Sequence, residues 1–520
     1  MAASCATKSQ KTAVLASKTK MREAFPAVHS PYYEGAVQET SSRVSFDTID
    51  PSNGSVLASI EVASSHDLEA AVESARRAFP VWSKTPPSAR AKVLLKAAEI
   101  LRRRNDEIAR METLDTGKPF SETSTVDVVT GADVLEYYAG LISGGGLNGE
   151  TIPLRQDAWV YTKKEPLGVC VGIGAWNYPI QIALWKSAPC LAAGNTMVYK
   201  PSEFTPLHGI VLAQIYTEAG LPPGVFNVAH GAGDVGAALV NHPAIAKVSF
   251  TGQVATGQKV ARAAGGGMKY ATMELGGKSP LIILPDANLE DAVDGAMLAN
   301  FFSTGQVCTN GTRVFVPAAL KTDFETLLLK KMEYIRPGPT MDPNINFGPL
   351  SSSAHHRKVL QYIQHGIEQD NATLLCGGLN PPANLDPSLQ KGFWVSPTVF
   401  TNCTDSMKIV KEEIFGPVMS ILSYDTVDEV VARANSTVLG LAAGVFTRDI
   451  NLAHSIIDRL DAGITWINSW GESPAEMPVG GWKMSGMGVE NGRRGIEAWV
   501  RNKSTLVDMS GKVATVFTKL

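Results

Sequence analysis

Gly168 to Lys200 reads GVCVGIGAWNYPIQIALWKSAPCLAAGNTMVYK, and this stretch sets the pattern for much of the chain. Two short apolar runs, 169–173 and 197–200, flank a segment of helical periodicity. Similar runs recur, separated by helical patterns, at 225–228, 247–250, 281–284, 314–316, 419–422 and 443–446. Strands that alternate with helices indicate parallel βαβ units, so we expect an α/β fold with an open, doubly wound sheet. Ligands of such sheets bind beyond the carboxyl ends of the strands.

Helical periodicity also precedes this stretch. Apolar residues recur at helical spacing over 65–79, where serines stand at the start, and again over 94–101. Residues 110–141 are expected to hold further helix that ends near Gly140. The proline-containing stretch 381–387 is expected to form a surface loop.

The composition excludes several classes of protein. With 520 residues, 44% of them hydrophobic, the chain is long enough for two or more packed units. A net charge of −3 offers no general attraction for nucleic acid or anionic lipid, and no apolar run is long enough to span a membrane. The six cysteines, at positions 5, 170, 190, 308, 376 and 403, form no CxxC pair, which argues against a zinc site or a disulfide framework. The adjacent pair His355-His356 lacks further ligands nearby in the sequence.

The two ends of the chain carry conflicting targeting signals. The first 22 residues contain Lys and Arg among Ser, Thr and Ala, with no acidic residue, which suits either an organelle-import peptide or a solvated tail. The chain ends in Thr518-Lys519-Leu520, a variant of a peroxisomal address. We therefore expect an intracellular protein of the cytoplasm or of a mitochondrial or peroxisomal matrix, without choosing among them.

The segment 305–310, Gly-Gln-Val-Cys-Thr-Asn, carries the first candidate catalytic residue. Cys308 follows a helical stretch, 289–302, and precedes an expected strand, 312–316, so it lies in a loop. The thiolate is the nucleophilic form of cysteine, and we expect backbone N–H groups of the loop to favour it. The alternative is a buried, inert cysteine.

Glu274 and Asn177 are further candidates. Glu274 ends a strand-like run and is followed by two glycines, which allow close approach of backbone to a ligand. A carboxylate in apolar surroundings has a raised pKa and can act as a general base, whereas the alternative is a surface glutamate paired with Lys278. Asn177 precedes Tyr178-Pro179, where its amide either caps a helix or points at a developing oxyanion.

Taken together and in order, these segments resemble the aldehyde dehydrogenase family. The resemblance runs from about residue 40 to about residue 510. The motifs that carry it are WNYP at 176–179, KPSE at 200–203, FTG at 250–252, ELGGK at 274–278, GQVC at 305–308, EEIFGP at 412–417 and GGWKMSG at 480–486.

The resemblance implies a mechanism. Cys308 attacks the aldehyde carbonyl, and the Asn177 amide with the Cys308 backbone N–H holds the oxyanion of the tetrahedral adduct. Hydride leaves to the nicotinamide of NAD, and Glu274 activates the water that hydrolyses the thioester. Lys186 and Glu490 are implied to support a proton relay, with an ordinary salt bridge or helix-face charge as the alternative.

NAD is the cofactor that the resemblance implies. A formal GxGxxG at 231–236 follows the expected strand 225–228 and by itself suggests dinucleotide binding. In the family, however, the pyrophosphate lies near the FTG segment at the start of the next helix, so 231–236 would mainly shape a neighbouring loop. The residues expected to contact NAD are Gly174, Ala175, Trp176, Lys200, Pro201, Ser202, Glu203, Gly252, Gln253, Val254, Ala255, Thr256, Gly276, Glu413 and Phe415. Lys200 and Glu203 would bind the adenosine ribose, Glu413 the nicotinamide ribose, and a carboxylate at the ribose favours NAD over NADP.

Three stretches, 112–118, 121–127 and 470–478, resemble betaine aldehyde dehydrogenases within the family. The implied reaction converts betaine aldehyde to glycine betaine, an osmoprotectant. Tyr178 and Trp185, two turns apart on one helix face, and Trp470 would form an aromatic wall for the trimethylammonium group, or else are simply core residues. Val479 stands where relatives often carry an aromatic residue, so trimethylaminobutyraldehyde or another aminoaldehyde is an alternative substrate.

The resemblance also implies ion sites, domains and assembly. A potassium ion would bind at Thr48, Ile49 and Asp115, and another at Lys483 and Gly486. We expect an N-terminal extension at 1–30, an NAD-binding domain at 31–145 and 168–278, a catalytic domain at 279–479, and a β-ribbon for oligomerisation at 146–167 and 494–510. Family members form dimers or tetramers by adding this ribbon to a neighbour's sheet.

Two other functions would fit the same fold. One is a non-catalytic structural protein, which the presence of all three catalytic candidates disfavours. The other is an acylating dehydrogenase that passes its thioester to coenzyme A, which Glu274 disfavours because it matches a residue that promotes hydrolysis.

Overall fold

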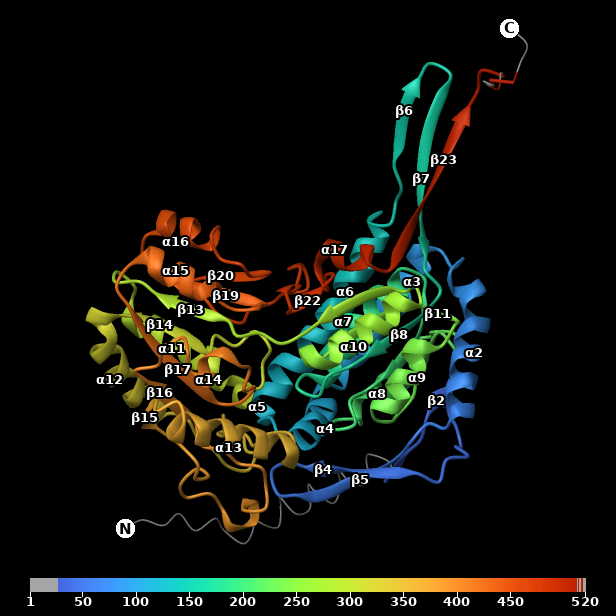
Figure 1. Cartoon of the computed structure of the whole chain (residues 1–520). Helices are drawn as coiled ribbons and strands as arrows, with labels where there is room; N and C mark the ends of the chain where they lie inside the picture. The colour runs from blue at the N-terminus through green and yellow to red at the C-terminus, as the bar shows by residue number, and fades with distance from the viewer. Residues whose placement is uncertain (1–26, 512, 514–515, 518–520) are drawn as a thin grey trace.

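The computed structural model describes residues 27–511, 513 and 516–517, which form two large sheets and a projecting three-stranded arm (Figure 1). The targeting signals expected in residues 1–22 and at 518–520 lie outside the described residues. None of the helices in the described part of the chain has the length and apolar character needed to span a bilayer.

The first sheet has eight strands in the order β22-β12-β11-β8-β9-β10-β2-β3. The five from β12 to β10 run parallel, and antiparallel strands close both sides. Their bounds are β2 Tyr32–Tyr33, β3 Ala36–Val37, β8 Val169–Ile173, β9 Thr196–Lys200, β10 Phe226–Val228, β11 Ile245–Thr251, β12 Tyr270–Glu274 and β22 Gly486–Met487. Every residue of β8 and β9 is buried, as is usual when helices cover both faces of a parallel sheet.

Helices cover this sheet. Those that connect its strands are α7 Pro179–Ala192, α8 His208–Glu218, α9 Gly233–Asn241 and α10 Val254–Gly266. Those that precede it in the chain are α2 Ser65–Trp82, α3 Pro87–Arg103, α4 Asn105–Thr116, α5 Phe120–Glu122, the π-helical turn η1 Thr123–Asp127 and α6 Val128–Ser143. The helix expected over 110–141 is therefore interrupted. Gly117 has a φ of 81° and ends α4, a conformation that glycine adopts without steric cost.

The second sheet has seven strands in the order β15-β16-β17-β14-β13-β19-β20. All neighbours are parallel except β15 and β16. Its strands are β13 Pro280–Ile283, β14 Arg313–Pro317, β15 Thr373–Cys376, β16 Thr398–Thr401, β17 Val418–Tyr424, β19 Ala442–Phe446 and β20 Ile464–Ile467. Its helices are α11 Leu289–Phe301, the 3-10 turns η2 Phe302–Gly305 and η3 Ala318–Leu320, α12 Lys321–Met332, α13 Ser353–Glu368, α14 Lys408–Lys411, α15 Val427–Asn435 and α16 Ile450–Ile457. The stretch 381–387 is a loop that runs into the 3-10 turn η4 Pro387–Leu389.

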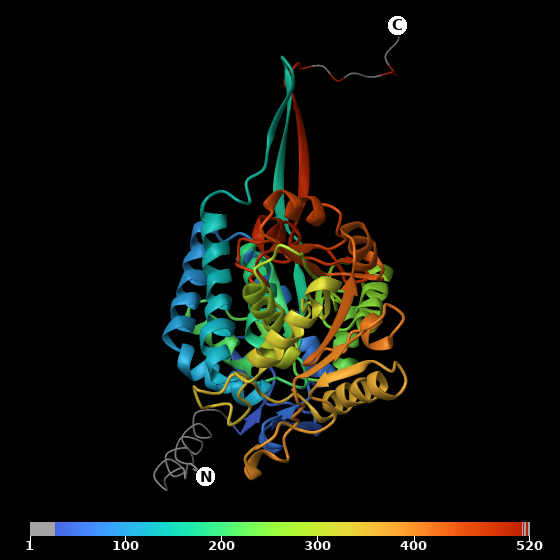
Figure 2. The same cartoon turned by 90° about the vertical axis from the view of Figure 1, so that its left-hand side faces the viewer.

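The arm consists of β6 Thr151–Arg155, β7 Ala158–Pro166 and β23 Val500–Asp508 in the antiparallel order β23-β7-β6. It stands clear of the rest of the chain in both Figure 1 and Figure 2. The α17 helix, Gly492–Glu497, leads into β23. Two smaller sheets, β1-β5-β4 (Val28–His29, Ser55–Glu61, Ser45–Asp50) and β18-β21 (Leu439–Gly440, Trp482–Lys483), complete the fold.

The expected fold class is confirmed. Each of the eight strands proposed from the sequence is present with its bounds displaced by no more than a residue or two. The short strands β1 to β5 were not expected, because runs of two residues, or of mixed polar and apolar residues, carry little periodicity.

Candidate active site

Cys308 lies in the loop between η2 and β14, and this loop is in close contact with the segment that follows β12. A Cβ atom placed on Gly277 would lie 2.7 Å from the Cys308 carbonyl oxygen, and one on Gly276 would overlap the Glu413 carboxylate. The two glycines after Glu274 are therefore required for close packing. They bring the ends of β12, the cysteine loop and the segment after α14 together.

The Cys308 thiol is half-buried, and its environment keeps it protonated. Burial, and to a lesser extent the carboxylates of Glu413 and Glu274, raise the pKa of Cys308 to about 12. The backbone N–H groups of Cys308 and Thr309 act in the opposite direction but are outweighed. The backbone N–H groups of the loop therefore favour the thiolate, as expected, but burial and two nearby carboxylates dominate in the protein without ligand.

Glu274 ends β12 and is only 6% exposed, so it is not the surface glutamate of the alternative interpretation. Burial, and then the negative charge of Glu490, raises its pKa well above the usual value for a glutamate, while Lys186 lowers it. Its Oε1 atom accepts no hydrogen bond from the residues that the structure describes. A buried carboxyl with a raised pKa and a free oxygen is suited to accept and return a proton.

Lys186 and Glu490 form a buried salt bridge of 2.7 Å. The Lys186 Nζ also donates to Ser249 Oγ at 3.1 Å, and Ser249 Oγ donates to Glu490 Oε1 at 2.9 Å. The structure therefore contains the salt bridge that was the alternative interpretation of these two residues. The charges of Lys186 and Glu490 also act on the pKa of Glu274, so this pair lies close to the candidate base.

Asn177 does not act as a helix cap, because the residue that caps α7 is Tyr178. The Asn177 side chain instead donates from Nδ2 to the carbonyl oxygen of Gln306 at 2.9 Å, two residues before Cys308. An amide nitrogen carries two protons, so one N–H remains for another acceptor.

The nucleotide residues expected from the sequence fall into two groups. Near α10, Gln253 is the N-cap and makes no side-chain cap, so the N–H groups of the first turn are open to a phosphate. Near β9, Lys200 Nζ donates to the carbonyls of Pro201 and Gly231, at 2.9 and 2.5 Å, and lies 3.6 Å from Glu203. The carbonyl of Gly231, in the glycine segment 231–236, therefore helps to hold Lys200.

Glu413 and an aromatic cluster contain further residues of the expected nucleotide site. Glu413 Oε1 accepts from the Gly277 N–H at 3.2 Å, and burial raises the Glu413 pKa. Trp176 packs edge-on against Phe415 at 5.2 Å and against His355 at 4.9 Å. His355 Nε2 bonds the Phe415 carbonyl at 2.6 Å, and His356 Nε2 bonds the Trp394 carbonyl at 3.1 Å. These open N–H groups and glycine contacts fit a dinucleotide.

The aromatic residues expected to contact substrate lie in two places. Tyr178 is the N-cap residue of α7, and Trp185 lies within that helix. Trp185 and Cys308 pack against one apolar cluster that also contains Trp470 and Val479. Tyr178 bonds Ser303 Oγ at 2.7 Å instead, and the Lys118 ammonium lies 3.9 Å from the centre of its ring.

At the first expected cation site, the Asp115 carboxyl is hydrogen-bonded to other residues of the protein. Asp115 accepts from Thr48 Oγ1 at 2.7 Å and from the Leu207 N–H at 3.0 Å, and burial raises its pKa to about 7. Within the described residues, no cluster of three or more His, Cys, Asp or Glu side chains could hold a metal ion. That finding does not test a site built from backbone carbonyls.

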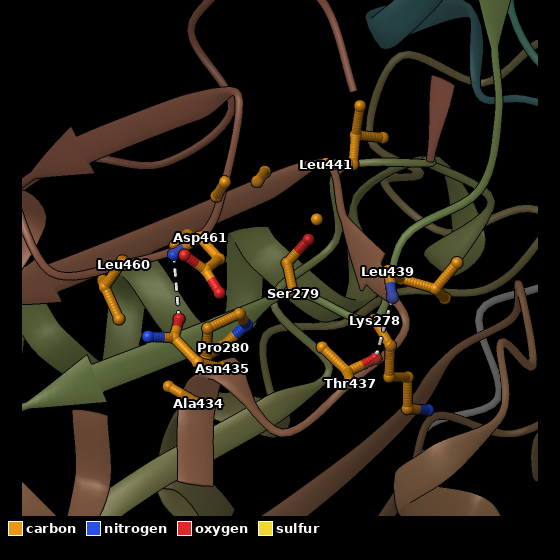
Figure 3. Close-up of a pocket in the computed structure, with 14 residues that line it drawn as sticks. Lys278, Ser279, Pro280, Ala434, Asn435, Thr437, Leu439, Leu441, Leu460 and Asp461 are labelled. Carbon is orange, nitrogen blue, oxygen red and sulfur yellow. Dashed lines mark hydrogen bonds between the residues drawn. The ribbon is translucent and has the colours of Figure 1, made fainter. Parts of the chain in front are cut away.

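At the second expected cation site, the Lys483 ammonium already occupies a polar pocket. It donates to the carbonyls of Asn435 and Thr437 at 2.9 and 3.2 Å and pairs with Asp461 at 2.9 Å. Figure 3 shows these three acceptor residues around a small cavity that has room for about one water molecule. This cavity is separate from the Cys308 loop.

Three residues at the site were not singled out individually in the sequence: Lys118, Glu122 and Ser303. Lys118 and Glu122 lie in the two stretches that carried the betaine aldehyde dehydrogenase resemblance, which was the available signal. Ser303 lies five residues before the candidate nucleophile, in a part of the chain read only as the end of a helix.

The comparisons with known proteins agree with this geometry. The aldehyde dehydrogenase family model matches residues 37–505. An aldehyde dehydrogenase from Bacillus cereus in complex with NAD+ is 39% identical, with 94% of this chain and 98% of that chain covered and a TM-score of 0.90. A betaine aldehyde dehydrogenase from Staphylococcus aureus in complex with NAD+ is 36% identical, with 96% and 99% covered and a TM-score of 0.92. An indole-3-acetaldehyde dehydrogenase in complex with NAD+ is also 36% identical, with 95% and 99% covered and a TM-score of 0.91.

The chain therefore belongs to the aldehyde dehydrogenase family, as its motifs indicated. Relatives named for different aldehydes are equally similar to it, so overall identity does not select a substrate.

Proposed function

We propose that this aldehyde dehydrogenase oxidises its substrate through a thioester on Cys308, with Asn177 binding the oxyanion and Glu274 as the base. The observation that carries the proposal is the packing around the cysteine loop. Asn177 holds the loop at Gln306, and the backbone after Glu274 contacts it at Cys308. A nucleophile, an oxyanion donor and a base thus converge on one segment.

The pKa shifts indicate which groups give and take protons in the reaction. Because the thiol is protonated at neutral pH, its proton must leave to solvent water as sulfur bonds to the carbonyl carbon, so Glu274 remains free for the later hydrolysis. The carbonyl electron pair moves to oxygen, where the remaining N–H of Asn177 stabilises it. After oxidation, Glu274 takes a proton from water, and the hydroxide adds to the thioester. The carbon–sulfur bond then breaks to release the acid, and the sulfur takes up the proton that Glu274 held.

NAD would supply the hydride acceptor when bound. The open first turn of α10 would hold its pyrophosphate, Lys200 and Glu203 its adenosine ribose, and Glu413 its nicotinamide ribose. A carboxylate at Glu203 repels a 2′-phosphate and so favours NAD over NADP.

We propose betaine aldehyde as the substrate, with trimethylaminobutyraldehyde or another aminoaldehyde as the alternative. Three buried acids, Glu112, Glu122 and Asp127, surround the single cation Lys118, and this excess of carboxyl groups beside Tyr178 suits a cationic substrate. A quaternary ammonium group donates no hydrogen bond, so aromatic faces such as those of Tyr178, Trp185 and Trp470 suit it.

A substrate panel tests this proposal. Betaine aldehyde and 3,3-dimethylbutanal have the same shape and differ in charge, so we expect kcat/KM to be about tenfold or more higher for betaine aldehyde. Equal values would contradict cation recognition. A preference for trimethylaminobutyraldehyde or for primary aminoaldehydes would select the alternative.

Cys308→Ala tests the mechanism and separates the other functional classes. The variant should form no NADH while still binding NAD. NADH formation by the wild type that requires coenzyme A would indicate an acylating enzyme. No NADH under any condition would indicate a structural protein.

We further propose that the arm joins copies of the chain, and that the ranges given above are its domains. The edge strand β6 is exposed along its whole length, including Ile152 and Leu154, and edge strands of this kind pair with other chains. Sedimentation of the full chain should show a dimer or tetramer. If potassium binds at Thr48, Ile49 and Asp115 or at Lys483 and Gly486, activity should be higher in KCl than in NaCl.

A further inference from the structure

Ser303 and Thr304, just before the cysteine loop, adopt a conformation that side-chain-bearing residues rarely hold. Their φ values are 49° and 55°, and Gly305 follows with a φ of 71°. Three consecutive left-handed residues turn the chain from α11 into the loop that presents Cys308. Only glycine takes this conformation without strain, so contacts from elsewhere must hold Ser303 and Thr304 in it.

The main contact on Ser303 comes from Glu122, at the end of α5. Glu122 Oε1 accepts the Ser303 backbone N–H at 3.2 Å, and Oε2 accepts the Ser303 hydroxyl at 2.9 Å. Both side chains are buried. Glu122 belongs to the helices of the first sheet, whereas Ser303 belongs to the second, so this pair of bonds joins the two parts of the molecule at the start of the cysteine loop.

The same carboxylate also sets the orientation of Tyr178. A serine hydroxyl has one proton, and Ser303 gives it to Glu122, so the 2.7 Å bond to Tyr178 must be donated by the tyrosine. The hydrogen bonds therefore run from Tyr178 through Ser303 to Glu122. Glu122 accepts from Ser303 at both of its oxygens, and an ionised carboxylate is the form that accepts at both.

Ser303 also forms hydrogen bonds with the loop that carries Cys308. Its carbonyl accepts from the Gln306 backbone N–H and side chain at 3.1 and 3.2 Å. The Gln306 carbonyl in turn holds Asn177. The position of Ser303 therefore affects both the sulfur of Cys308 and the amide proposed to bind the oxyanion.

We infer that Glu122 is a positioning residue for the oxidation, fixing through Ser303 the loop that carries Cys308 and the ring of Tyr178. The inference rests on the proposed role of Cys308 as nucleophile. Glu122 touches neither the reacting atoms nor the proposed cofactor residues.

The charges around Glu122 make this role dependent on pH. Burial raises the pKa of Glu122 to about 7, Asp127 adds to that rise, and Lys118 opposes it. Lys118 is itself ion-paired with Asp127, and the negative charge of Asp127 raises the pKa of Glu112. Below about pH 7 Glu122 gains a proton, so one of its two oxygens becomes a donor and no longer accepts from Ser303.

The test compares Glu122→Gln with the wild type over pH 6 to 9. We expect kcat to fall on the order of 10- to 100-fold, because small misplacements of reacting groups cost this much, while KM for NAD stays unchanged. The acid limb of the wild-type kcat profile near pH 7 should be absent from the variant. The matched control is Glu325→Gln. Glu325 lies in α12 and accepts a hydrogen bond from Thr401, and its variant should retain wild-type kcat.

A double-mutant cycle distinguishes positioning from general destabilisation. If Glu122 acts through Ser303, Ser303→Ala and Glu122→Gln together should cost little more than either alone, whereas independent effects would multiply. Wild-type kcat and pH profile in Glu122→Gln, or multiplying losses, would overturn the inference. Cys308→Ala is assayed in parallel, since activity in that variant would show that the proposed nucleophile is wrong, whatever Glu122 does.

Discussion

The Cys308 thiol should react slowly with iodoacetamide near neutral pH in the protein without cofactor. Its pKa of about 12 stands about three units above the usual value of 9.0, because of burial and the carboxylates of Glu413 and Glu274. Each unit of increase in pKa lowers the thiolate fraction about tenfold. At pH 8 the thiolate should therefore be about a thousandfold scarcer than for a cysteine whose pKa is 9.0.

The sign of the pH dependence follows directly. The alkylation rate should rise tenfold for each pH unit up to at least pH 10, without the plateau near pH 9 that an ordinary thiol shows. Glu413→Gln removes one of the two charges and should speed alkylation at every pH in this range. The site of modification is assigned by peptide mass, and Cys308→Ala serves as the control. A plateau near pH 8 or 9 would refute this account of the thiol environment.

Three further predictions concern the groups around the cysteine loop. Glu274→Gln should give a first-turnover burst of NADH in stopped flow but reduce steady-state turnover on the order of 10²- to 10⁴-fold, since the amide cannot activate water; an unchanged steady state would argue for another base. Gly276→Ala should weaken NAD binding in calorimetry, because its methyl group overlaps the Glu413 carboxylate, while Gly265→Ala, where the space is open, should not. Asp115 has its pKa raised by burial to about 7, so its contribution to stability is present below its unfolded value near 4 and is lost as pH rises through 7, by at most about 1.4 kcal/mol per pH unit. The difference in urea unfolding free energy between wild type and Asp115→Asn should change in that window, and a constant difference would contradict the raised pKa.

Much of the fold could be predicted from the sequence. The buried strands of a parallel sheet are continuous apolar runs, so β8, β9, β13 and β19 are visible without any structure. By contrast, a side chain at Gly117 would clash with Pro349, which is distant in sequence, and no local pattern shows this contact.

The candidate site was only partly predictable. Ordered motifs pointed to Cys308 and Glu274, but the protonation state of the thiol depends on burial and on Glu413, which comes from a different part of the chain. The bond between Glu122 and Ser303 joins residues 181 positions apart. Such a contact arises from tertiary packing, and a single sequence does not reveal it.

Mass spectrometry of Glu274→Gln after mixing with betaine aldehyde and NAD tests the central claim most directly. The thioester should accumulate, because hydrolysis is blocked while hydride transfer is not, so the peptide containing Cys308 should gain the mass of the acyl group. Hydroxylamine should remove that mass, and Cys308→Ala should never acquire it. An unmodified Cys308 peptide during the NADH burst, or an acyl group on a different residue, would contradict the account.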